Sequence, residues 1–184
     1  AFIEAMNQEF APALFYGNSG LNPEKFTGFA PRYSQTPATA GTLGYTNIVD
    51  GAGSGGDNTS IWLIGWGDNT IHGIYPKGST AGLQHEDFGE QTISLGATMG
   101  GARMRALQER FVWDCGIALK DWRYVVRIAN IDTSDLVANS SPADLTNAMI
   151  KAVARGPSLN MVRPAFYMNR TVFEMLDIVR AYAK

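Results

Sequence analysis

Two histidines and a short acidic run are the residues of this chain whose types could support metal binding or acid–base catalysis. His72, His85, Glu86 and Asp87 would supply the imidazole and carboxylate groups that such chemistry needs. Their spacing does not suit it, because no second ligand lies four residues after His85, and His72 lies thirteen residues before it. We therefore expect a solvated charged segment at 85–87, with no metal, no cofactor and no enzymatic activity.

A glycine-rich run at Gly51–Gly56, GAGSGG, matches the pattern of a phosphate-binding loop and follows a short expected strand near 45–49. A phosphate cradle also requires the N-terminus of a helix directly after the loop. Here the next residues, 57–60, lead into another expected strand instead. The run is therefore interpreted as a flexible linker.

Four tryptophans could form a stacking platform for a sugar, as in a carbohydrate-binding β module. Trp62 and Trp66 would share one face of a strand, whereas Trp113 and Trp122 differ in parity, so the sequence indicates no single flat platform. Core and interface aromatic residues are the favoured interpretation. The sugar-binding module of a phage tail or cell-surface protein is kept as the alternative function.

The composition is that of a globular protein with one domain or two small ones: 184 residues, 45% hydrophobic and 17% charged. A net charge of -2 with scattered Lys and Arg predicts no general attraction to nucleic acid. The single cysteine, Cys115, allows no internal disulfide and fits an intracellular origin. The sequence contains neither an apolar run of eighteen residues nor a signal-peptide pattern, so no membrane contact is expected.

A long strand is the most distinctive element that the pattern predicts. Apolar residues occupy nearly every odd position between Leu107 and Leu119, which is the period of a strand with one buried face. At about 3.3 Å per residue this strand would reach roughly 40 Å, and it would run into a second strand ending at Asp132. Such a length suggests a protein built to span distance.

The other expected elements make the chain a mixed α+β protein. An N-terminal helix carries an awkward Pro12, which predicts a kink or a restart, and residues 18–59 form an irregular connection. Segments 60–66 and 70–75 should pair as an antiparallel hairpin, and 84–101 as an arm or hairpin. Ser141 and Pro142 should begin a helix. The residues expected to face inward in the last two helices are Leu145, Ala148, Met149, Ala152, Val153, Val172, Phe173, Leu176 and Val179.

Several long segments resemble the major capsid proteins of tailed bacteriophages with Hong Kong 97-type shells. They are IWLIGWGDNTIHGIYPKGSTAGLQHEDFGEQT (61–92) and FVWDCGIALKDWRYVVRIANID (111–132), together with LFYGNSGLNPEKFTGFAPRY (14–33), PADLTNAMIKAV (142–153) and MNRTVFEMLDIVRA (168–181). The resemblance implies a Hong Kong 97-type fold. It also implies that the chain is a piece of a larger subunit, lacking an upstream arm and most of the spine helix as well as later axial-domain strands.

The resemblance assigns a role to each part of the chain. Residues 1–17 would be the end of the spine helix and 18–59 a Gly/Pro-rich connection. Residues 60–136 would be the peripheral domain, with a projecting arm near 84–101, and 137–184 part of the axial domain. The implied function is structural: many copies, arranged as pentamers and hexamers, build an icosahedral shell around a double-stranded DNA genome.

The same resemblance sets the expected partners and location. Scaffold, portal or cement proteins are further possible partners, and packaged DNA would be met only through incidental contacts on the inner surface. The protein would be found in the virion after assembly in the host cytoplasm. The residues predicted to contact neighbouring subunits are Glu86, Asp87 and Glu90 on the arm, with Arg123 and Arg127 as their opposite charges. The two arginines are expected to share one face of the second strand, and a solvated face is the alternative for them.

Overall fold

The computed structural model describes residues 2–34, 46–78, 80, 82–96, 101–138 and 143–182. These residues form two compact units. The first unit combines residues 1–72 with 117–184, and the second consists of residues 73–116. The mixed α+β class expected from the sequence is confirmed, because each unit contains strands and the first also contains helices.

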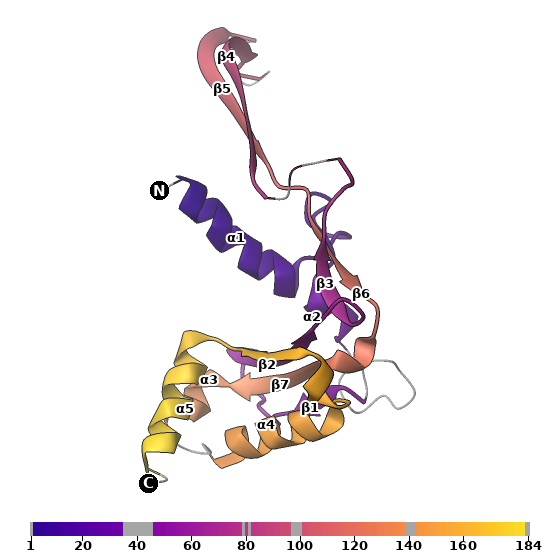
Figure 1. Ribbon diagram of the computed structural model, residues 1–184. Coiled ribbons are helices and arrows are strands. Elements are labelled where there is room, and N and C mark those ends of the chain that lie inside the picture. Colours follow the sequence, from indigo (N-terminus) through magenta and orange to yellow (C-terminus); the bar gives the residue numbers. More distant parts are fainter. Residues whose placement is uncertain are drawn as a thin grey trace. The chain divides into compact units, whose positions relative to one another are not determined.

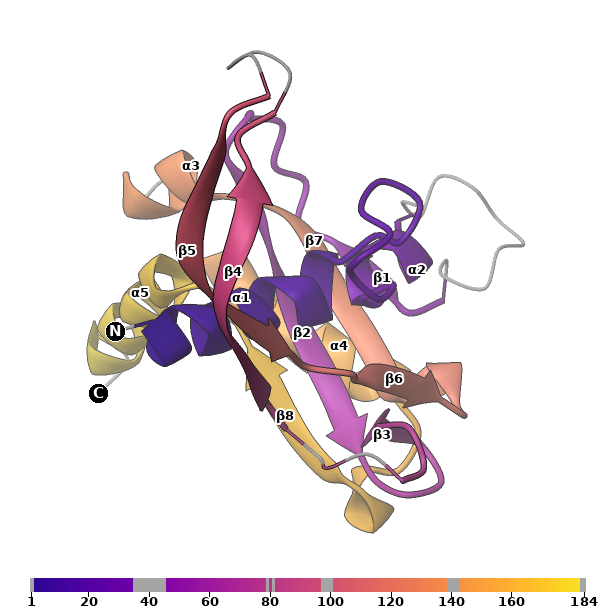
Figure 2. The same cartoon turned by 90° about the horizontal axis from the view of Figure 1, so that it is seen from above.

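Two antiparallel strands, β2 (Asn58–Trp66) and β7 (Val125–Asp132), form the centre of the sheet in the first unit. Strand β1 (Ile48–Asp50) lies parallel to β7, and β8 (Arg163–Tyr167) lies antiparallel to β2. The short strands β3 (Ile71–Ile74) and β6 (Gly116–Leu119) continue the order β1-β7-β2-β3-β6. Figure 2 shows β2, β7 and β8 from above.

Helices cover both faces of this sheet, which explains why β2 and β7 are apolar at successive positions rather than alternating ones. On one face lie α3 (Thr133–Val137), α4 (Ala143–Arg155) and α5 (Arg170–Tyr182), packed against Ile61 and Ile128. On the other lie α1 (Phe2–Tyr16) and α2 (Phe29–Arg32), packed against Trp62 and Ile64 (Figure 1). The first unit is therefore a three-layer helix–sheet–helix structure.

Hydrogen bonds from buried polar side chains connect the residues that follow α2 to the start of β7. The Tyr33 hydroxyl donates to the Trp122 carbonyl (2.9 Å), and the Asn47 side-chain amide donates to the carbonyls of Trp122 (3.0 Å) and Val125 (2.9 Å). Burial raises the pKa of Tyr33 well above its usual value. Leaving a buried donor or acceptor unpaired is costly, so these hydrogen bonds hold the segments that carry Tyr33 and Asn47 against the start of β7.

The second unit is dominated by a two-stranded antiparallel hairpin of β4 (Gln84–Ser94) and β5 (Arg103–Val112). Every residue of both strands is exposed or half-buried. Strand β4 lies within the segment 84–101 that was expected to form an arm or hairpin, whereas its partner strand β5 lies after that segment. Within the described residues, neither core cluster of the protein includes a residue of this hairpin.

The prediction of a single long strand from 107 to 119 is wrong. Strand β5 ends at Val112, β6 begins at Gly116, and a 3-10 turn (Trp122–Tyr124) separates β6 from β7. The alternation was misleading because no described residue of the hairpin belongs to a core cluster that could bury its apolar positions, and Leu107 is 82% exposed. The turn is stabilised where the Asp121 side chain accepts a hydrogen bond from the Arg123 amide.

The antiparallel hairpin expected for 60–75 is also wrong. Strands β2 and β3 meet at one pair, Trp66 with Ile71, and that pair is parallel. The intervening turn is held by the Thr70 hydroxyl, which donates to the Gly65 carbonyl (2.8 Å). The Thr70 carbonyl accepts from the Lys120 amide (2.8 Å), so the chain leaves β2 toward the segment that follows β6.

The helices follow the predicted pattern with three corrections. Pro12 lies inside one uninterrupted helix, so the predicted restart is wrong. Val153 (43% exposed) and Phe173 (52% exposed) do not face inward, whereas Leu145, Ala152 and Val172 are buried. Ser141, Pro142 and the Val179 side chain lie outside the described residues. No helix among the described residues is both long and apolar enough to cross a membrane.

Candidate interaction surfaces

Two of the three acidic residues of β4, Glu86 and Glu90, are paired across the hairpin with arginines of β5. Glu86 Oε2 lies 3.9 Å from Arg110 Nη1, and Glu90 Oε2 lies 3.7 Å from Arg105 Nη1. All four side chains are more than half exposed. Pairs of this kind contribute little to stability in water, so these carboxylates stay available to other cations.

A β-bulge lies between these two acids. Asp87 is opposite Glu109 and Glu90 is opposite Leu107, so Phe88 and Gly89 together face one residue of β5. Gly89 has a left-handed backbone (φ 65°), and its amide donates to the Asp87 carboxylate (2.8 Å). The Asp-Phe-Gly sequence favours this turn because glycine adopts positive φ at low cost.

The bulge determines which side chains share a face of the hairpin. Directly opposite residues lie on the same face and successive residues on opposite faces, and the extra residue reverses the parity of β4 after Gly89. The face called the Ile93 face carries Gln84, Glu86, Gln91, Ile93, Met104, Ala106, Gln108, Arg110 and Val112. The face called the Asp87 face carries His85, Asp87, Glu90, Thr92, Ser94, Arg103, Arg105, Leu107, Glu109 and Phe111.

His85 belongs to the Asp87 face and is held by side chains of β5. Its ring stacks on Phe111 (centroids 4.6 Å apart), and its Nε2 lies 3.3 Å from Glu109 Oε2. His72 lies in β3, and its buried Nδ1 has no hydrogen-bond partner among the described residues. Among the described residues, no group of three or more His, Cys, Asp or Glu side chains is arranged to hold a metal ion.

The two candidate arginines occupy different environments. Arg123 is in the 3-10 turn, where its guanidinium donates to both carboxylate oxygens of Asp121 (2.8 and 3.0 Å) and holds the pKa of that acid below its usual value. Arg127 is in β7 and half-buried, and burial lowers its pKa. The expectation that they share one strand face is therefore wrong, because Arg123 precedes the strand.

Arg127 makes its contacts within its own unit. Its guanidinium donates to the Tyr33 carbonyl (2.7 Å) and to the Ser60 hydroxyl (3.1 Å). The same group lies over the Trp62 ring, 5.2 Å from the ring centroid. Sequence reasoning missed this role, because it depends on three segments that the fold brings together.

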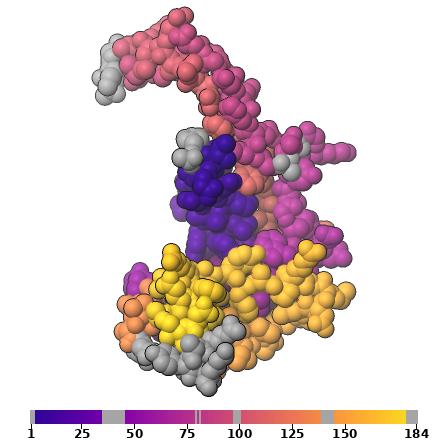
Figure 3. Space-filling model, turned by 60° about the vertical axis from the view of Figure 1, so that its left-hand side comes forward, coloured from indigo at the N-terminus to yellow at the C-terminus, as the bar shows by residue number. Residues whose placement is uncertain are grey.

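An apolar groove of about 1110 Å³ lies in the first unit along α1, β8 and α5. Figure 3 shows the surface of α1 in indigo and that of α5 in yellow. Phe173 and Tyr16, both about half exposed, contribute to its walls. The complete lining is Ala11, Pro12, Phe15, Tyr16, Thr59, Ser60, Trp62, Met149, Phe166, Tyr167, Met168, Asn169, Arg170 and Phe173.

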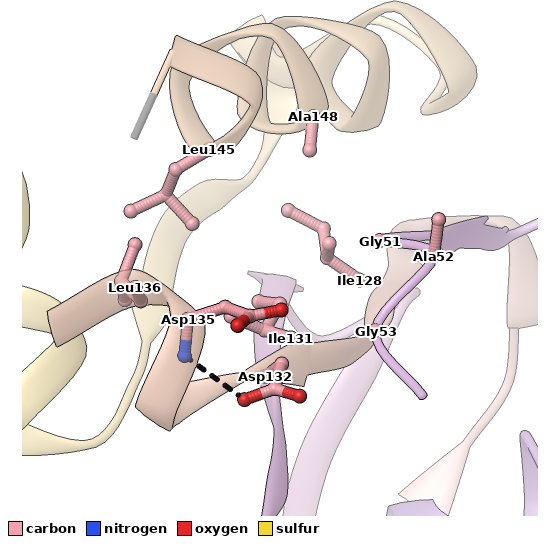
Figure 4. A pocket seen from close by; sticks show the side chains of 10 residues that line it. All are labelled: Gly51, Ala52, Gly53, Ile128, Ile131, Asp132, Asp135, Leu136, Leu145 and Ala148. Carbon is pink, nitrogen blue, oxygen red and sulfur yellow. Dashed lines mark hydrogen bonds between the residues drawn. The ribbon is translucent and has the colours of Figure 1, made fainter. Parts of the chain in front are cut away.

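A second, smaller hollow of about 230 Å³ contains the glycine run (Figure 4). The amides of Gly51 and Gly53 donate to the carbonyls of Ala129 and Asn130 (both 2.8 Å), so the first part of the run is held against β7 rather than being a free linker. Asp132, which caps α3, also lines the hollow. Occupied amides and a carboxylate are unsuited to a phosphate.

The tryptophans of β2 are core residues. Trp62 is 2% exposed, and Trp66 packs against the same cluster with its Nε1 donating to the Tyr167 hydroxyl (2.8 Å). Trp113 and Trp122 are half-buried. A buried ring presents no face to a sugar, so the favoured interpretation of Trp62 as a core residue is confirmed and the carbohydrate-binding alternative has no support.

The model of a family described as major capsid protein GP7 matches residues 1–184. Among solved structures, a chain of the bacteriophage Epsilon15 cryo-EM structure is similar, with 26% sequence identity and a TM-score of 0.61. The match covers 95% of this chain and 52% of that one, so this chain spans about half the length of its structural relative. The comparison with curated proteins found no match.

Proposed function

The chain belongs to the family of the major capsid protein GP7, and from that premise we propose that many copies of its protein assemble into the icosahedral shell of a tailed phage head. The shell would enclose a double-stranded DNA genome, with the subunits arranged as pentamers and hexamers. The observation that carries this proposal is the family match over all 184 residues. The protein is accordingly a structural component of the virion.

We further propose that the chain is divided into four parts with different roles in the subunit. Residues 1–17 would be the end of a spine helix, 18–59 its connection, 60–136 a peripheral domain and 137–184 part of an axial domain. An arm near 84–101 is supported by the hairpin, which forms part of a compact unit of its own within residues 73–116. Assembly would take place in the host cytoplasm, with scaffold, portal or cement proteins as further partners and incidental DNA contacts.

Electron microscopy of the full-length protein, expressed alone and with a scaffold-type partner, tests the shell proposal. Closed shells or curved shell fragments are expected in negative stain, with fast-sedimenting material in the same sample. A protein that stays monomeric under both conditions contradicts the proposal.

We also propose that the candidate residues Glu86, Asp87, Glu90, Arg123 and Arg127 contact neighbouring subunits. The support is strongest for the three acids, because each lies on a strand with no buried position. Arg123 is exposed, whereas Arg127 would first have to leave its contacts with Tyr33, Ser60 and Trp62.

Neutral substitutions test the acids more cleanly than lysines, since lysines at 86 and 90 would repel Arg110 and Arg105 within the hairpin. The variant E86Q/D87N/E90Q is expected to fold normally and to give fewer shells. The matched control, E4Q/E24Q/D177N, removes three exposed acids outside the hairpin and should assemble normally. Equal shell yields from the two variants would contradict the contact.

A further inference from the structure

The groove along α1, β8 and α5 is lined by a residue with an unpaired buried donor. Trp62 belongs to the lining and is 2% exposed, and its buried Nε1 has no hydrogen-bond partner among the described residues. Leaving a buried N–H group unpaired is costly, and such groups are rare in native proteins. The unpaired Nε1 therefore indicates that an acceptor atom binds at this part of the groove.

A half-buried cation lies beside the same ring. The Arg127 guanidinium lies over Trp62 and donates to the hydroxyl of Ser60, which also lines the groove. Burial lowers the pKa of Arg127, and no carboxylate among the described residues forms an ion pair with it. Because a buried charge is costly unless an opposite charge offsets it, an anion bound here would be stabilised.

The polar lining residues gather toward one end of the groove. Trp62 of β2 directly faces Tyr167 of β8 in an antiparallel pair. Ser60 precedes Trp62 by two residues and Asn169 follows Tyr167 by two, so both lie toward the same end. Arg170 comes next and begins α5. This end of the groove therefore offers hydroxyl, amide and guanidinium donors.

The rest of the lining is mainly apolar, with Phe15, Met149 and Phe166 among its residues. None of the described residues that line the groove is an Asp or Glu, and the Glu174 that bonds to Arg170 (2.9 Å) lies outside the lining. The volume of about 1110 Å³ is large enough for a small molecule, since ligand sites typically measure roughly 300–1,000 Å³. These properties suit an apolar chain with an anionic end.

We propose that the groove binds a free anionic amphiphile of the long-chain carboxylate class. The carboxylate accepts hydrogen bonds from Trp62 Nε1 and the Ser60 hydroxyl, and its charge offsets that of Arg127. The hydrocarbon chain lies along the apolar lining, where burial against Phe166 and Phe173 removes it from water. The site is formed by one chain, so this inference goes beyond the proposed shell function and does not depend on it.

Calorimetric titration of the full-length protein with dodecanoate, kept below its micelle concentration, tests the site. One saturable site per chain is expected. Dodecyltrimethylammonium carries the same hydrocarbon chain and the opposite charge, so it should bind about tenfold more weakly or worse. Equal affinities for the two amphiphiles, no saturable binding of dodecanoate, or binding to phosphatidylglycerol vesicles alone would each overturn the proposal. None of these results would bear on the formation of shells.

A pair of matched variants locates the bound chain. Ala11→Trp places a large side chain at an exposed position in the wall of the groove and should weaken dodecanoate binding about tenfold or more, because the space is filled. Ala5→Trp makes the same change at an exposed position of α1 outside the lining, and its affinity should match that of the wild type. Equal affinities of the two variants would contradict binding in the groove.

Substitution of the cations tests the position of the carboxylate. Arg127→Gln removes the half-buried charge, so dodecanoate should bind about tenfold more weakly, whereas dodecyltrimethylammonium should not. The titration is run below the unfolding midpoint of the variant, and unchanged dodecanoate affinity would overturn the proposal. If Arg127→Gln does not fold, Arg170→Gln decides in the same way, with an expected loss of about threefold because Arg170 is exposed. Arg163→Gln, an exposed position of β8 outside the lining, is the control and should bind normally.

Discussion

Replacing Arg127 by alanine should destabilise the sheet unit, whereas the same change at Arg123 should not. The two arginines are four residues apart and both were candidates for contacts between subunits. Arg127 donates to the Tyr33 carbonyl and the Ser60 hydroxyl and covers the Trp62 ring. Arg123 bonds to Asp121, two residues away, at the surface.

The magnitude follows from what the Arg127 change removes. A hydrogen bond to a charged group contributes about 1.5–3 kcal/mol, and a cation–π contact about 0.5–2 kcal/mol. Part of this gain is offset in the wild type by the cost of burying the guanidinium, which is also why burial lowers its pKa. We expect Arg127→Ala to lower the free energy of unfolding by about 2–4 kcal/mol.

Urea unfolding of the full-length protein, followed by tryptophan fluorescence, measures this difference. The midpoint should fall for Arg127→Ala at an unchanged slope, and it should stay within error for Arg123→Ala. Arg127→Lys keeps the charge but loses the planar fork, so it should fall between the wild type and Arg127→Ala.

Equal midpoints for Arg127→Ala and Arg123→Ala would refute this reasoning, because the internal contacts of Arg127 would then contribute nothing. The stability and the assembly of Arg127→Ala together distinguish two roles for this residue, a contact between subunits and a contact within the sheet unit. A variant that is stable but forms no shells would identify Arg127 as a contact between subunits. An unstable variant would show that Arg127 stabilises the sheet unit through its internal contacts.

Three further outcomes are expected. Gly17→Ala should lower the free energy of unfolding by about 1–3 kcal/mol, because the new Cβ would clash with the carbonyl oxygens of residues 13 and 26. A Cβ at Gly56 meets open space, so Gly56→Ala should leave the midpoint of the same urea assay unchanged. Ile128→Ala, at a fully buried position, should cost about 2–5 kcal/mol, against a much smaller change for Ile93→Ala, as measured by thermal unfolding. Asp132 caps α3, and its hydrogen bond with Ser134 lowers the pKa of its carboxyl group. Its stabilising effect should therefore be present above the ordinary Asp pKa and be lost as the pH falls through the lower pKa of the native state. Asp132→Asn should flatten that part of a curve of stability against pH, and an unchanged curve would contradict the capping role.

The sequence predicted the central sheet because burial and pattern agree there. Residues of β2 and β7 are apolar at successive positions, and tertiary packing covers both of their faces. The hairpin unit lacks this agreement. Alternation from 107 to 119 suggested a buried face, but no position of β5 is buried, and the strand ends at Val112.

The candidate contacts were predictable in type but not in arrangement. Acids on an exposed strand could be recognised from the segment 84–94 alone. Their division between two faces depends on the bulge at Phe88 and Gly89, which periodicity does not reveal. The groove could not be predicted either, since its lining comes from segments near residues 11–16, 59–62 and 149–173 that meet through long-range packing.

The close approach of Gly73 and Gly116 has a consequence for how this protein can vary. A Cβ built at Gly73 would lie 4.0 Å from the Gly116 carbonyl oxygen, so the two ends of the second unit lie close together. None of the described residues between them belongs to a buried core cluster. We therefore expect that the segment between the two glycines can be lengthened, shortened or exchanged without loss of the core, and a short linker joining them should yield a folded sheet unit that lacks the hairpin.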